Sequence, residues 1–275
     1  MKAWRRRSSR EGASEGATAP TRPDRPIDEL ARRGFAAAAD AYEAARPGYP
    51  DRAVARISDE LGLHRGRTVL DLGAGTGKLT RQLLGRGASV MACEPVAAMR
   101  ARLLEAVPDV SLVEGTAESL ALPGASVDVV TVGQAFHWFD ADAALLEIAR
   151  VLRPGGGLAL LWNERDETTP WVAEMSRLIG WHERTVSRYQ HVDWASVVAA
   201  SACFAPLHEE VVHFEHPTTH ELLAERVRSI SYVAAMPPAQ RERLVHEVGQ
   251  LAARLPEPFP FPYRCRVLWT TALRR

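Results

Sequence analysis

The sequence predicts an α/β protein with a Rossmann-like, mostly parallel sheet and helices on both of its faces. Apolar runs of strand length alternate with amphipathic helical patterns between residues 67 and 165, which is typical of βαβ units. The first of these runs ends in an acid and then three glycines at alternate positions, directly before a helical pattern. Together these features predict a ligand-binding turn at the carboxyl end of a buried parallel strand.

The elements before the glycines are predicted to be helical. The alanine-rich stretch from Phe35 to Ala45 favours a helix, and the segment Arg46-Pro47-Gly48-Tyr49-Pro50 ends it. Asp51 is then placed to cap a second helix, which has one apolar face.

The glycine-rich turn discriminates between three kinds of cofactor. A phosphate-binding P-loop is excluded, because it needs a longer spacing than Gly73 to Gly77 and a Ser or Thr after its lysine. A dinucleotide fingerprint is disfavoured, because Lys78 stands where it needs a third glycine. Asp71 lies poorly for a pyrophosphate and suits a cofactor with a cationic amine, such as S-adenosylmethionine. Gly73, Gly75 and Gly77 would let the backbone approach that cofactor closely.

A second acid follows the next predicted strand. Residues 88–93 form an apolar run that ends at Glu94, roughly 20 residues beyond the glycines. A carboxylate at the tip of a second strand can accept hydrogen bonds from both hydroxyls of a ribose. Taken alone, Glu94 would more commonly be a solvated acid, but its spacing from the Asp71 turn favours the ribose.

The alternation of strands and helices continues to Trp162 and then changes. Three strands and two helices complete the alternating region: strands at 110–113, 127–132 and 158–162, a helix over 99–107 and a helix capped by Asp140. After them, helices are predicted over 170–200 and 220–252, around a strand at 208–215. Val267 to Leu273 predicts a closing strand after the proline-broken segment 256–262. We therefore expect a helical lobe inserted over the carboxyl ends of the strands, as a lid.

Composition excludes several classes of protein. The 34 basic and 34 acidic side chains balance, so no overall field attracts nucleic acid or an anionic membrane. No apolar run approaches the roughly 20 residues of a membrane-spanning helix. Residues 1–27 predict a disordered basic tail and no secretory signal. Cys93, Cys203 and Cys265 have no metal-like spacing, so we expect reduced thiols in a cytoplasmic protein.

With these features, residues 35–275 resemble the class I S-adenosylmethionine-dependent methyltransferases. The matching segments are Asp71–Gly77, Glu94, Gly115-Thr116-Ala117-Glu118, Gln134–Phe139 and Leu152–Gly156. Three further segments resemble a small-molecule branch that includes trans-aconitate-type carboxyl methyltransferases and quinone C-methyltransferases: Arg46–Pro50, Phe136-His137-Trp138 and Trp162-Asn163. The resemblance implies a seven-stranded, mostly parallel sheet whose last strand is antiparallel, with a helical lid lobe.

The pattern of elements and the resemblance together divide the chain into five parts. They are a disordered basic tail (1–27), N-terminal helices that cover the cofactor and substrate site (28–66), a cofactor-binding α/β core (67–165), a helical substrate lobe (166–205), and C-terminal strands and helices that complete the sheet and lid (206–275).

The resemblance also implies two groups of residues that bind S-adenosylmethionine. The first would hold its methionine end and ribose: Asp71 the amine, Gly73, Gly75 and Gly77 the methionine end, and Glu94 the ribose. The second follows the third and fourth strands: Thr116, Ala117 and Glu118 around the adenine, and Gln134 near the sulfonium.

The chemistry asks little of the protein, because methyl transfer from a sulfonium is an in-line displacement in which positioning and exclusion of water provide most of the acceleration. Tyr49, Phe136 and Trp138 are candidates for an aromatic rim of the substrate pocket. A carboxylate or enolate acceptor needs no base. A hydroxyl acceptor would use one, for which His137 is the catalytic candidate, and a packed structural role for His137 is the alternative.

The remaining histidines predict no metal site, and the remaining tryptophans leave two interpretations open. The later histidines lack ligand-like spacing, so no metal site is predicted. Trp171, Trp181 and Trp194 either line the acceptor pocket or pack inside the lobe.

The predicted function is therefore transfer of a methyl group from S-adenosylmethionine to a small-molecule acceptor, at a carboxylate, a hydroxyl or an activated carbon. A pocket lined by arginine would favour a carboxylate, and an aromatic one a quinone or phenol. A nucleic-acid substrate is disfavoured, because Gly133-Gln134-Ala135-Phe136 stands where amino-methylating enzymes carry an Asn/Asp-Pro-Pro-aromatic segment. A non-catalytic cofactor-binding module and an NAD-dependent oxidoreductase remain as alternatives.

Overall fold

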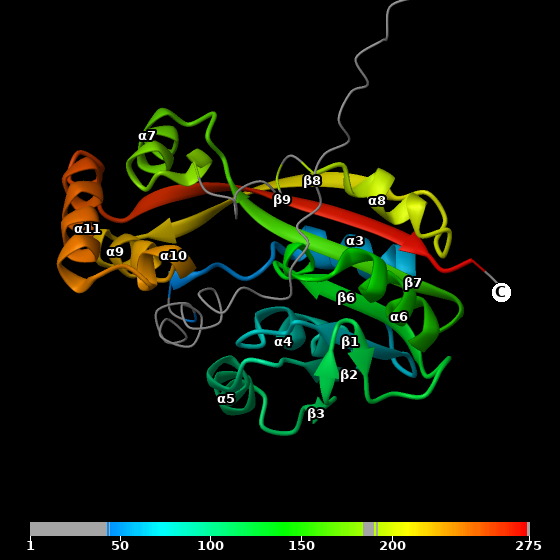
Figure 1. The fold of residues 1–275 in the computed structure, drawn as a ribbon. Helices are drawn as coiled ribbons and strands as arrows, with labels where there is room; N and C mark the ends of the chain where they lie inside the picture. Colours follow the sequence, from blue (N-terminus) through cyan, green and yellow to red (C-terminus); the bar gives the residue numbers. More distant parts are fainter. Residues whose placement is uncertain (1–42, 44, 184–189, 191, 274–275) are drawn as a thin grey trace, which may run out of the picture.

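The main sheet has seven strands in the order β3-β2-β1-β6-β7-β9-β8 (Figure 1). The structure is a computed structural model and describes residues 43, 45–183, 190 and 192–273. The predicted tail 1–27 and the predicted helix from Phe35, apart from Glu43 and Ala45, lie outside the described residues. β9 runs antiparallel to both of its neighbours, and the other pairings are parallel. The predicted fold class is confirmed.

The order of the strands creates a switch point between β1 and β6. The strands of the main sheet are β1 (Thr68–Leu72), β2 (Ser89–Cys93), β3 (Ser111–Leu112), β6 (Val127–Gly133), β7 (Leu152–Arg165), β8 (His208–Thr218) and β9 (Phe259–Thr271). A separate hairpin pairs β4 (Gly115–Thr116) with β5 (Ser119–Leu120). The chain adds β2 and β3 on one side of β1 and then returns to its other side for β6. Ligands of open α/β sheets bind at the carboxyl ends of strands at such a point.

Helices connect the strands and extend beyond them. They are α3 (Asp51–Leu61), α4 (Lys78–Leu84), α5 (Ala97–Ala106), α6 (Ala141–Val151), α7 (Pro170–Leu178), α8 (Trp194–Ala200), α9 (His220–Arg228), α10 (Ser231–Ala234) and α11 (Pro238–Ala252), with short 3₁₀ turns η1 (Phe136–Trp138) and η2 (Trp181–Glu183). Asp140 caps α6 as predicted, through its side chain. The predicted Asp51 cap was wrong: Pro50 is the N-cap of α3, and Asp51 lies in its first turn.

Alternate residues of the central strands pack against two layers of helices. Val69 and Val129 belong to the core formed with α3 and α4, whereas Leu70 and Val130 belong to the core formed with α6. All four side chains are fully buried. Because a parallel strand is buried on both faces, its sequence is continuously apolar, and this is why the early strands could be located from sequence.

The closing strand is longer than the sequence predicts. It begins at Phe259 instead of Val267 and includes Pro260 and Pro262. These first residues pair only with β8, and pairing with β7 begins at Tyr263. A proline is tolerated in a strand where its nitrogen faces a side without a partner. The predicted break over 256–262 was therefore wrong in its second half.

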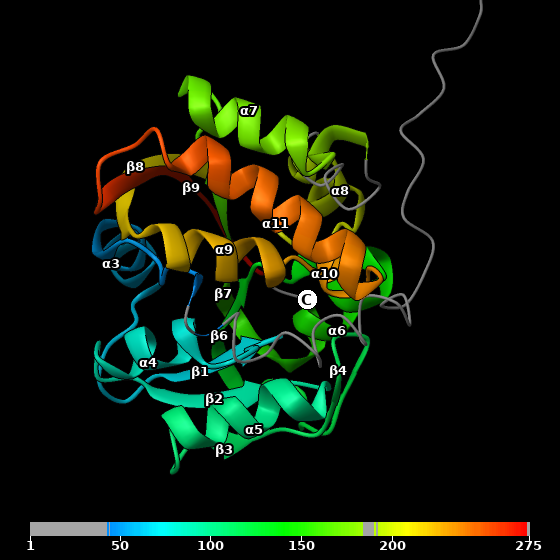
Figure 2. The ribbon, with the colours of Figure 1, turned by 90° about the vertical axis from the view of Figure 1, so that its left-hand side faces the viewer.

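Four of the helices after β7, namely α7, α9, α10 and α11, form a lobe at the carboxyl end of that strand, whereas α8 lies apart from them (Figure 1). α11 packs against α9 and α7, and α10 packs against α9. Figure 2 shows α7, α11 and α9 stacked beyond the sheet, above the level of α4 and α5. The predicted boundaries of the five parts stay predictions. Within the described ranges, no helix is both long and apolar enough to cross a membrane.

Candidate active site

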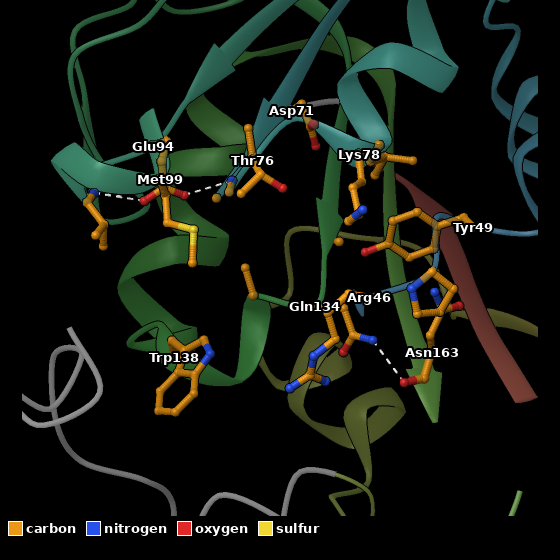
Figure 3. Close-up of a pocket in the computed structure, with 18 of the residues that line it drawn as sticks. Arg46, Tyr49, Asp71, Thr76, Lys78, Glu94, Met99, Gln134, Trp138 and Asn163 are labelled. Carbon is orange, nitrogen blue, oxygen red and sulfur yellow. Dashed lines mark hydrogen bonds between the residues drawn. The ribbon is translucent and has the colours of Figure 1, made fainter. Parts of the chain in front are cut away.

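A cavity lies at the carboxyl ends of β1, β2 and β6, where the strand order reverses. Its empty volume is about 970 Å³, counting the space open to solvent at its mouth. Binding sites for small molecules are concave and are found at such switch points of α/β sheets, so the cavity is the candidate site for a cofactor. Figure 3 shows residues of its wall. The wall includes several of the predicted site residues: Tyr49, Asp71, Gly73, Gly75, Glu94, Gln134 and Trp138.

The turn after β1 brings backbone to the cavity instead of side chains. The amides of Gly73 and Ala74 donate to the Cys93 carbonyl oxygen, at 2.8 and 3.1 Å. Gly73 and Gly75 have positive φ angles of 72° and 59°. A Cβ atom on Gly73 would lie 2.6 Å from the Ala135 Cβ, whereas one on Gly75 would meet empty space. That empty space is a cradle which a closely held cofactor can fill, so the turn fits S-adenosylmethionine.

The next residues of the turn serve packing. Gly77 has φ 85° and does not line the cavity; a Cβ there would lie 2.6 Å from Leu103 Cδ1. Lys78 Nζ donates to the Glu43 carbonyl oxygen at 2.7 Å, and Arg81 Nη2 lies 2.8 Å from Glu43 Oε1. Lys78 therefore ties the chain that precedes the cavity to α4, in addition to lining the wall.

Glu94 is held in one orientation by two backbone amides. Its Oε2 accepts a hydrogen bond from Gly75 N at 2.8 Å, and its Oε1 accepts one from Val96 N at 2.7 Å. The side chain lines the cavity although the residue is largely buried. Each carboxylate oxygen has a second lone pair, so Glu94 can also accept from ribose hydroxyls. The geometry fits the ribose contact, which stays a prediction.

Asp71 is a buried carboxylate in the cavity wall. Burial raises its pKa to about 6, and the nearby carboxylate of Glu94 adds to the rise. Thr80 Oγ1 donates to Asp71 Oδ2 at 2.6 Å and Thr131 Oγ1 to Oδ1 at 3.1 Å, which oppose the rise. Near neutral pH the group is therefore mainly ionised, and it is poorly hydrated. Such a carboxylate suits a cationic ligand group.

Gln134 adopts a backbone conformation that is uncommon outside glycine. Its φ is 56°, directly after β6. Its amide donates to the Leu161 carbonyl oxygen at 2.8 Å, and its Nε2 donates to the Asn163 carbonyl oxygen at 2.9 Å. These bonds to β7 hold the strained conformation, which points the side chain toward the cavity. Backbone strain of this kind costs about 1–3 kcal/mol and is concentrated at functional sites.

The segment that contains Tyr49 is fixed across the cavity from two sides. Tyr49 N donates to Gln82 Oε1 at 3.0 Å, and Gln82 Nε2 donates back to the Tyr49 carbonyl oxygen at 2.6 Å. Asn163 Nδ2 donates to the Gly48 carbonyl oxygen at 3.0 Å. The Tyr49 hydroxyl lies so close over Gly133 that a Cβ atom there would be 2.3 Å away. α4 and β7 thus hold Tyr49 over the end of β6.

Phe136 and His137 lie behind the cavity wall. Phe136 is fully buried and packs edge-to-face against Phe139 and Trp194, with ring centroids 5.8 and 5.3 Å apart. Trp162 Nε1 donates to His137 Nδ1 at 3.2 Å, and burial lowers the pKa of His137 to about 3. Neither residue lines the cavity. These contacts favour the packed alternative for His137; its catalytic role and the rim role of Phe136 stay predictions.

The predicted adenine segment also lies outside the wall. Thr116 is exposed in β4, Ala117 is buried, and Glu118 Oε1 accepts from Asp140 N at 3.1 Å. Val96 and Met99, which follow β2, do line the cavity, and Figure 3 shows Met99 beside Glu94. Adenine binding by residues 116–118 stays a prediction.

The three tryptophans predicted for the lobe pack in the interior. Trp171 lies against Phe261 with ring centroids 5.0 Å apart, and Trp194 stacks on Trp162 at 5.4 Å. The guanidinium carbon of Arg165 lies 4.1 Å from the ring centroid of Trp181. None of the three tryptophans lines the cavity, so these contacts favour packing over a pocket role. Across the described ranges, no group of three or more His, Cys, Asp or Glu side chains could hold a metal ion.

Sequence reasoning missed several residues of the wall, among them Arg226 and Tyr263. Arg226 lies on α9 between Leu223 and Val227, which are both buried, so an arginine stands on the apolar face of an amphipathic helix. An arginine on the apolar face of a predicted helix could therefore have indicated this residue from the sequence alone. Tyr263 follows Pro262, and the predicted strand break concealed it.

Comparisons with known proteins show which proteins this chain resembles in sequence and in fold. Residues 70–160 match the family model of the methyltransferase domain. The chain is 40% identical over 222 residues to an uncharacterized methyltransferase of Mycobacterium tuberculosis, covering 81% of this chain and 86% of the relative. It is 33% identical over 216 residues to an uncharacterized methyltransferase-like protein of Schizosaccharomyces pombe, covering 78% and 84%. The solved phosphoethanolamine N-methyltransferase 2 of Haemonchus contortus, in complex with S-adenosylhomocysteine, has the same fold, with a TM-score of 0.57 at 17% identity over 90% of this chain and 60% of that one.

The fold and the site together define a nucleoside-cofactor-binding α/β protein. Its last strand in the chain, β9, is antiparallel to its neighbours. Asp71 lies near the end of β1, Glu94 directly follows β2, and the glycine turn lies between them. The matches then identify the family. The chain belongs to the class I S-adenosylmethionine-dependent methyltransferases; it is an enzyme of that class, and S-adenosylmethionine is its cofactor.

Proposed function

We propose that this methyltransferase moves the methyl group of S-adenosylmethionine to a small-molecule acceptor, at a carboxylate, a hydroxyl or an activated carbon, by in-line displacement. The observation that carries the proposal is that one cavity has two sides of different origin. The glycine turn and Glu94 form one side of it, and side chains of the N-terminal segment, α9 and β9 form another. The first side would hold the cofactor, and the second would hold a small acceptor next to it.

Residues of the first wall would hold the cofactor. Glu94, fixed by the amides of Gly75 and Val96, would accept hydrogen bonds from the ribose, and Asp71 would attract the amine, directly or through water. When bound, S-adenosylmethionine supplies an electrophilic methyl group on a sulfonium. Trp138, in the wall, offers an aromatic face that favours positive charge nearby.

Most of the acceleration would come from positioning and from exclusion of water. Tyr49 is clamped over the end of β6 by Gln82, and Gln134 is clamped beside it by β7, so the groups nearest the reacting centre are rigid. Rigid placement of two reactants can supply several kcal/mol of the barrier. A carboxylate or enolate acceptor then needs no base, and a base whose pKa is about 3, as burial makes His137, would contribute little at neutral pH.

Two measurements test this proposal in sequence. Calorimetry should show that the protein binds S-adenosylmethionine and does not bind NAD; binding of NAD alone would contradict the proposal and favour an oxidoreductase. The protein should then transfer label from methyl-labelled S-adenosylmethionine to a member of a panel of small metabolites. Cofactor binding with label found only in an added nucleic acid or protein would overturn the small-molecule acceptor.

A further inference from the structure

The cavity has one acidic wall and one basic wall. Among the described residues that line it, the acids are Asp71 and Glu94, both on the cofactor side. Three cations of the described residues line it as well: Lys78, which pairs with Glu43; Arg46, from the segment before α3; and Arg226, from α9. Figure 3 shows Arg46 on the side of the pocket away from Glu94. A cavity polarised in this way favours an anionic group at the arginines.

The two arginines are held as one unit although they lie 180 residues apart. Arg46 Nε donates to Ser229 Oγ at 3.1 Å, and Ser229 Oγ donates to the Arg226 carbonyl oxygen at 2.7 Å. Ser229 is fully buried at the end of α9. This link fixes the lobe helix that carries Arg226 to the N-terminal segment at the cavity, so the positive wall has a defined geometry.

Arg226 is pre-positioned against two aromatic rings that stack on each other. The residue is 5% exposed. Its guanidinium carbon lies 4.8 Å from the ring centroid of Tyr263 and 5.0 Å from that of Phe261. A guanidinium keeps its charge in proteins, and in a poorly hydrated wall its attraction for an anion is stronger than at the surface. Its fork of donors matches the two oxygens of a carboxylate.

Several buried polar atoms of the residues that line the cavity have no hydrogen-bond partner within the described ranges. Among them are Tyr263 Oη and Asn163 Oδ1, in residues that are 1% and 9% exposed. A buried polar atom left unsatisfied costs about 1–3 kcal/mol, so these atoms indicate a ligand with polar groups. Burial raises the pKa of Tyr263, so its hydroxyl keeps its proton and can donate. An anion accepts such a hydrogen bond.

We propose that Arg226 and the hydroxyl of Tyr263 bind a carboxylate group of the methyl acceptor, and that Arg46 and Ser229 position Arg226 for it. This assignment rests on the proposed function, because it presumes a small-molecule acceptor beside the cofactor. The planar donor fork of Arg226 and the Tyr263 hydroxyl together match the two oxygens of a carboxylate. A guanidinium also pairs with phosphate, so the phosphonate probes in the experiment below separate the two anions.

Binding to the protein saturated with S-adenosylhomocysteine tests the assignment without turnover. The probes are small aliphatic and aromatic carboxylic acids, each paired with its primary amide and its phosphonate analogue, and the measurement is calorimetry. We expect acids of suitable shape to bind roughly tenfold more tightly than their amides. Arg226→Gln should weaken the acid by roughly 10- to 100-fold and leave its amide and S-adenosylhomocysteine unchanged.

Two further variants separate binding from folding. Tyr263→Phe removes only the unsatisfied hydroxyl, so it should leave thermal stability unchanged or raise it while it weakens acid binding by roughly 3- to 10-fold. Arg228→Gln is the matched control, because Arg228 is on the same helix but pairs with Glu225 and Glu242 outside the cavity. It should leave acid binding unaltered.

The outcomes distinguish the two proposals. If wild-type protein fails to bind S-adenosylhomocysteine, the proposed function fails. If S-adenosylhomocysteine binds but no acid binds better than its amide, or the phosphonates bind better than the acids, the carboxylate assignment is overturned alone. It is also overturned if Arg226→Gln weakens S-adenosylhomocysteine as much as it weakens the acid, because Arg226 would then serve the cofactor.

Discussion

The two walls of the cavity are assembled differently. The cofactor wall comes from one stretch of chain, from β1 to the residues after β6, in which each contributing turn directly follows a strand of the parallel sheet. The basic wall brings together Arg46, Asn163, Arg226 and Tyr263 from four separate elements. The cofactor side is therefore specified by local sequence, and the acceptor side by tertiary packing of the lobe. Changes in the first wall should alter cofactor affinity, and changes in the second should alter acceptor affinity.

The largest effect is expected from Gly75→Ala, which adds a methyl group to the cofactor wall. No protein atom lies within 4 Å of that methyl position, so the fold should tolerate it apart from the positive φ of 59°. The methyl group would instead occupy the cradle of the cofactor. We expect S-adenosylmethionine affinity to fall by roughly 100-fold, about 3 kcal/mol, in calorimetry.

Gly73→Ala is the matched comparison for that experiment. Its φ of 72° is similar, but its new methyl group would lie 2.6 Å from the Ala135 Cβ. The loss should therefore appear as lower thermal stability in the absence of ligand, which Gly75→Ala should show to a smaller extent. Equal destabilisation by both variants, with no specific loss of cofactor affinity in Gly75→Ala, would contradict the close approach.

A smaller loss is expected from Glu94→Gln. The amide can accept from only one of the Gly75 and Val96 amides and loses the charge that holds the ribose. Hydrogen bonds to charged groups are worth about 1.5–3 kcal/mol, so S-adenosylmethionine should bind roughly 10- to 100-fold more weakly. Glu105→Gln is the control outside the cavity wall, because Glu105 is exposed on α5 and pairs with Arg102; it should change affinity by less than about twofold. A comparable loss in Glu105→Gln would show that the effect does not depend on the carboxylate at the cavity.

The pH dependence of cofactor binding should come from Asp71. Burial raises its pKa to about 6, and the cationic amine binds the ionised form. Affinity should therefore be full above about pH 7 and fall by up to tenfold per pH unit below 6. Calorimetry between pH 5 and 8 measures this, and Asp71→Asn should bind weakly with no such dependence. A wild-type profile as flat as that of the variant would exclude Asp71 as the amine's partner.

The same carboxylate affects stability with the opposite sign. Because the folded pKa of Asp71 lies above its usual value of 3.8, the folded state holds the proton more tightly than the unfolded state. Its contribution to the free energy of unfolding should therefore fall as the pH rises from about 4 to 6, and stay low above that. Denaturation at pH 8 should show Asp71→Asn to be the more stable protein, by on the order of 2 kcal/mol. A loss of stability would mean that the bonds from Thr80 and Thr131 dominate.

The contrast between the walls also explains how far sequence reasoning could reach. The alternating strands and helices, the glycine turn and Glu94 could be predicted, because buried parallel strands are continuously apolar and their ends fall at fixed spacings. The seven-stranded sheet with its antiparallel last strand was implied by the resemblance to the methyltransferases. Lys78, which disfavoured a dinucleotide motif in the sequence, has a role that only the structure shows: it holds Glu43 and thus the chain before the cavity.

The basic wall could not be assembled from sequence for a physical reason. Arg226 meets Tyr263 only because β9 begins at Phe259 and α9 packs over it, and proline spacing hides that start. Arg46 reaches the same wall through Ser229, a contact between residues 183 positions apart. No periodicity encodes such a contact, since it depends on how the lobe closes on the sheet.

The smallest effect on turnover is expected from His137→Ala, because His137 does not line the cavity. Trp162 Nε1 donates to the Nδ1 atom of His137, and a pKa of about 3 keeps the ring neutral near neutral pH. We expect turnover at saturating substrate within roughly threefold of wild type, with lower thermal stability because the buried indole loses its acceptor. His137 should likewise contribute no inflection to the pH–rate profile, so the profiles of wild type and His137→Ala should have the same shape. A loss of 100-fold or more at unchanged cofactor affinity would contradict this and restore His137 as the general base, which would in turn require a hydroxyl acceptor.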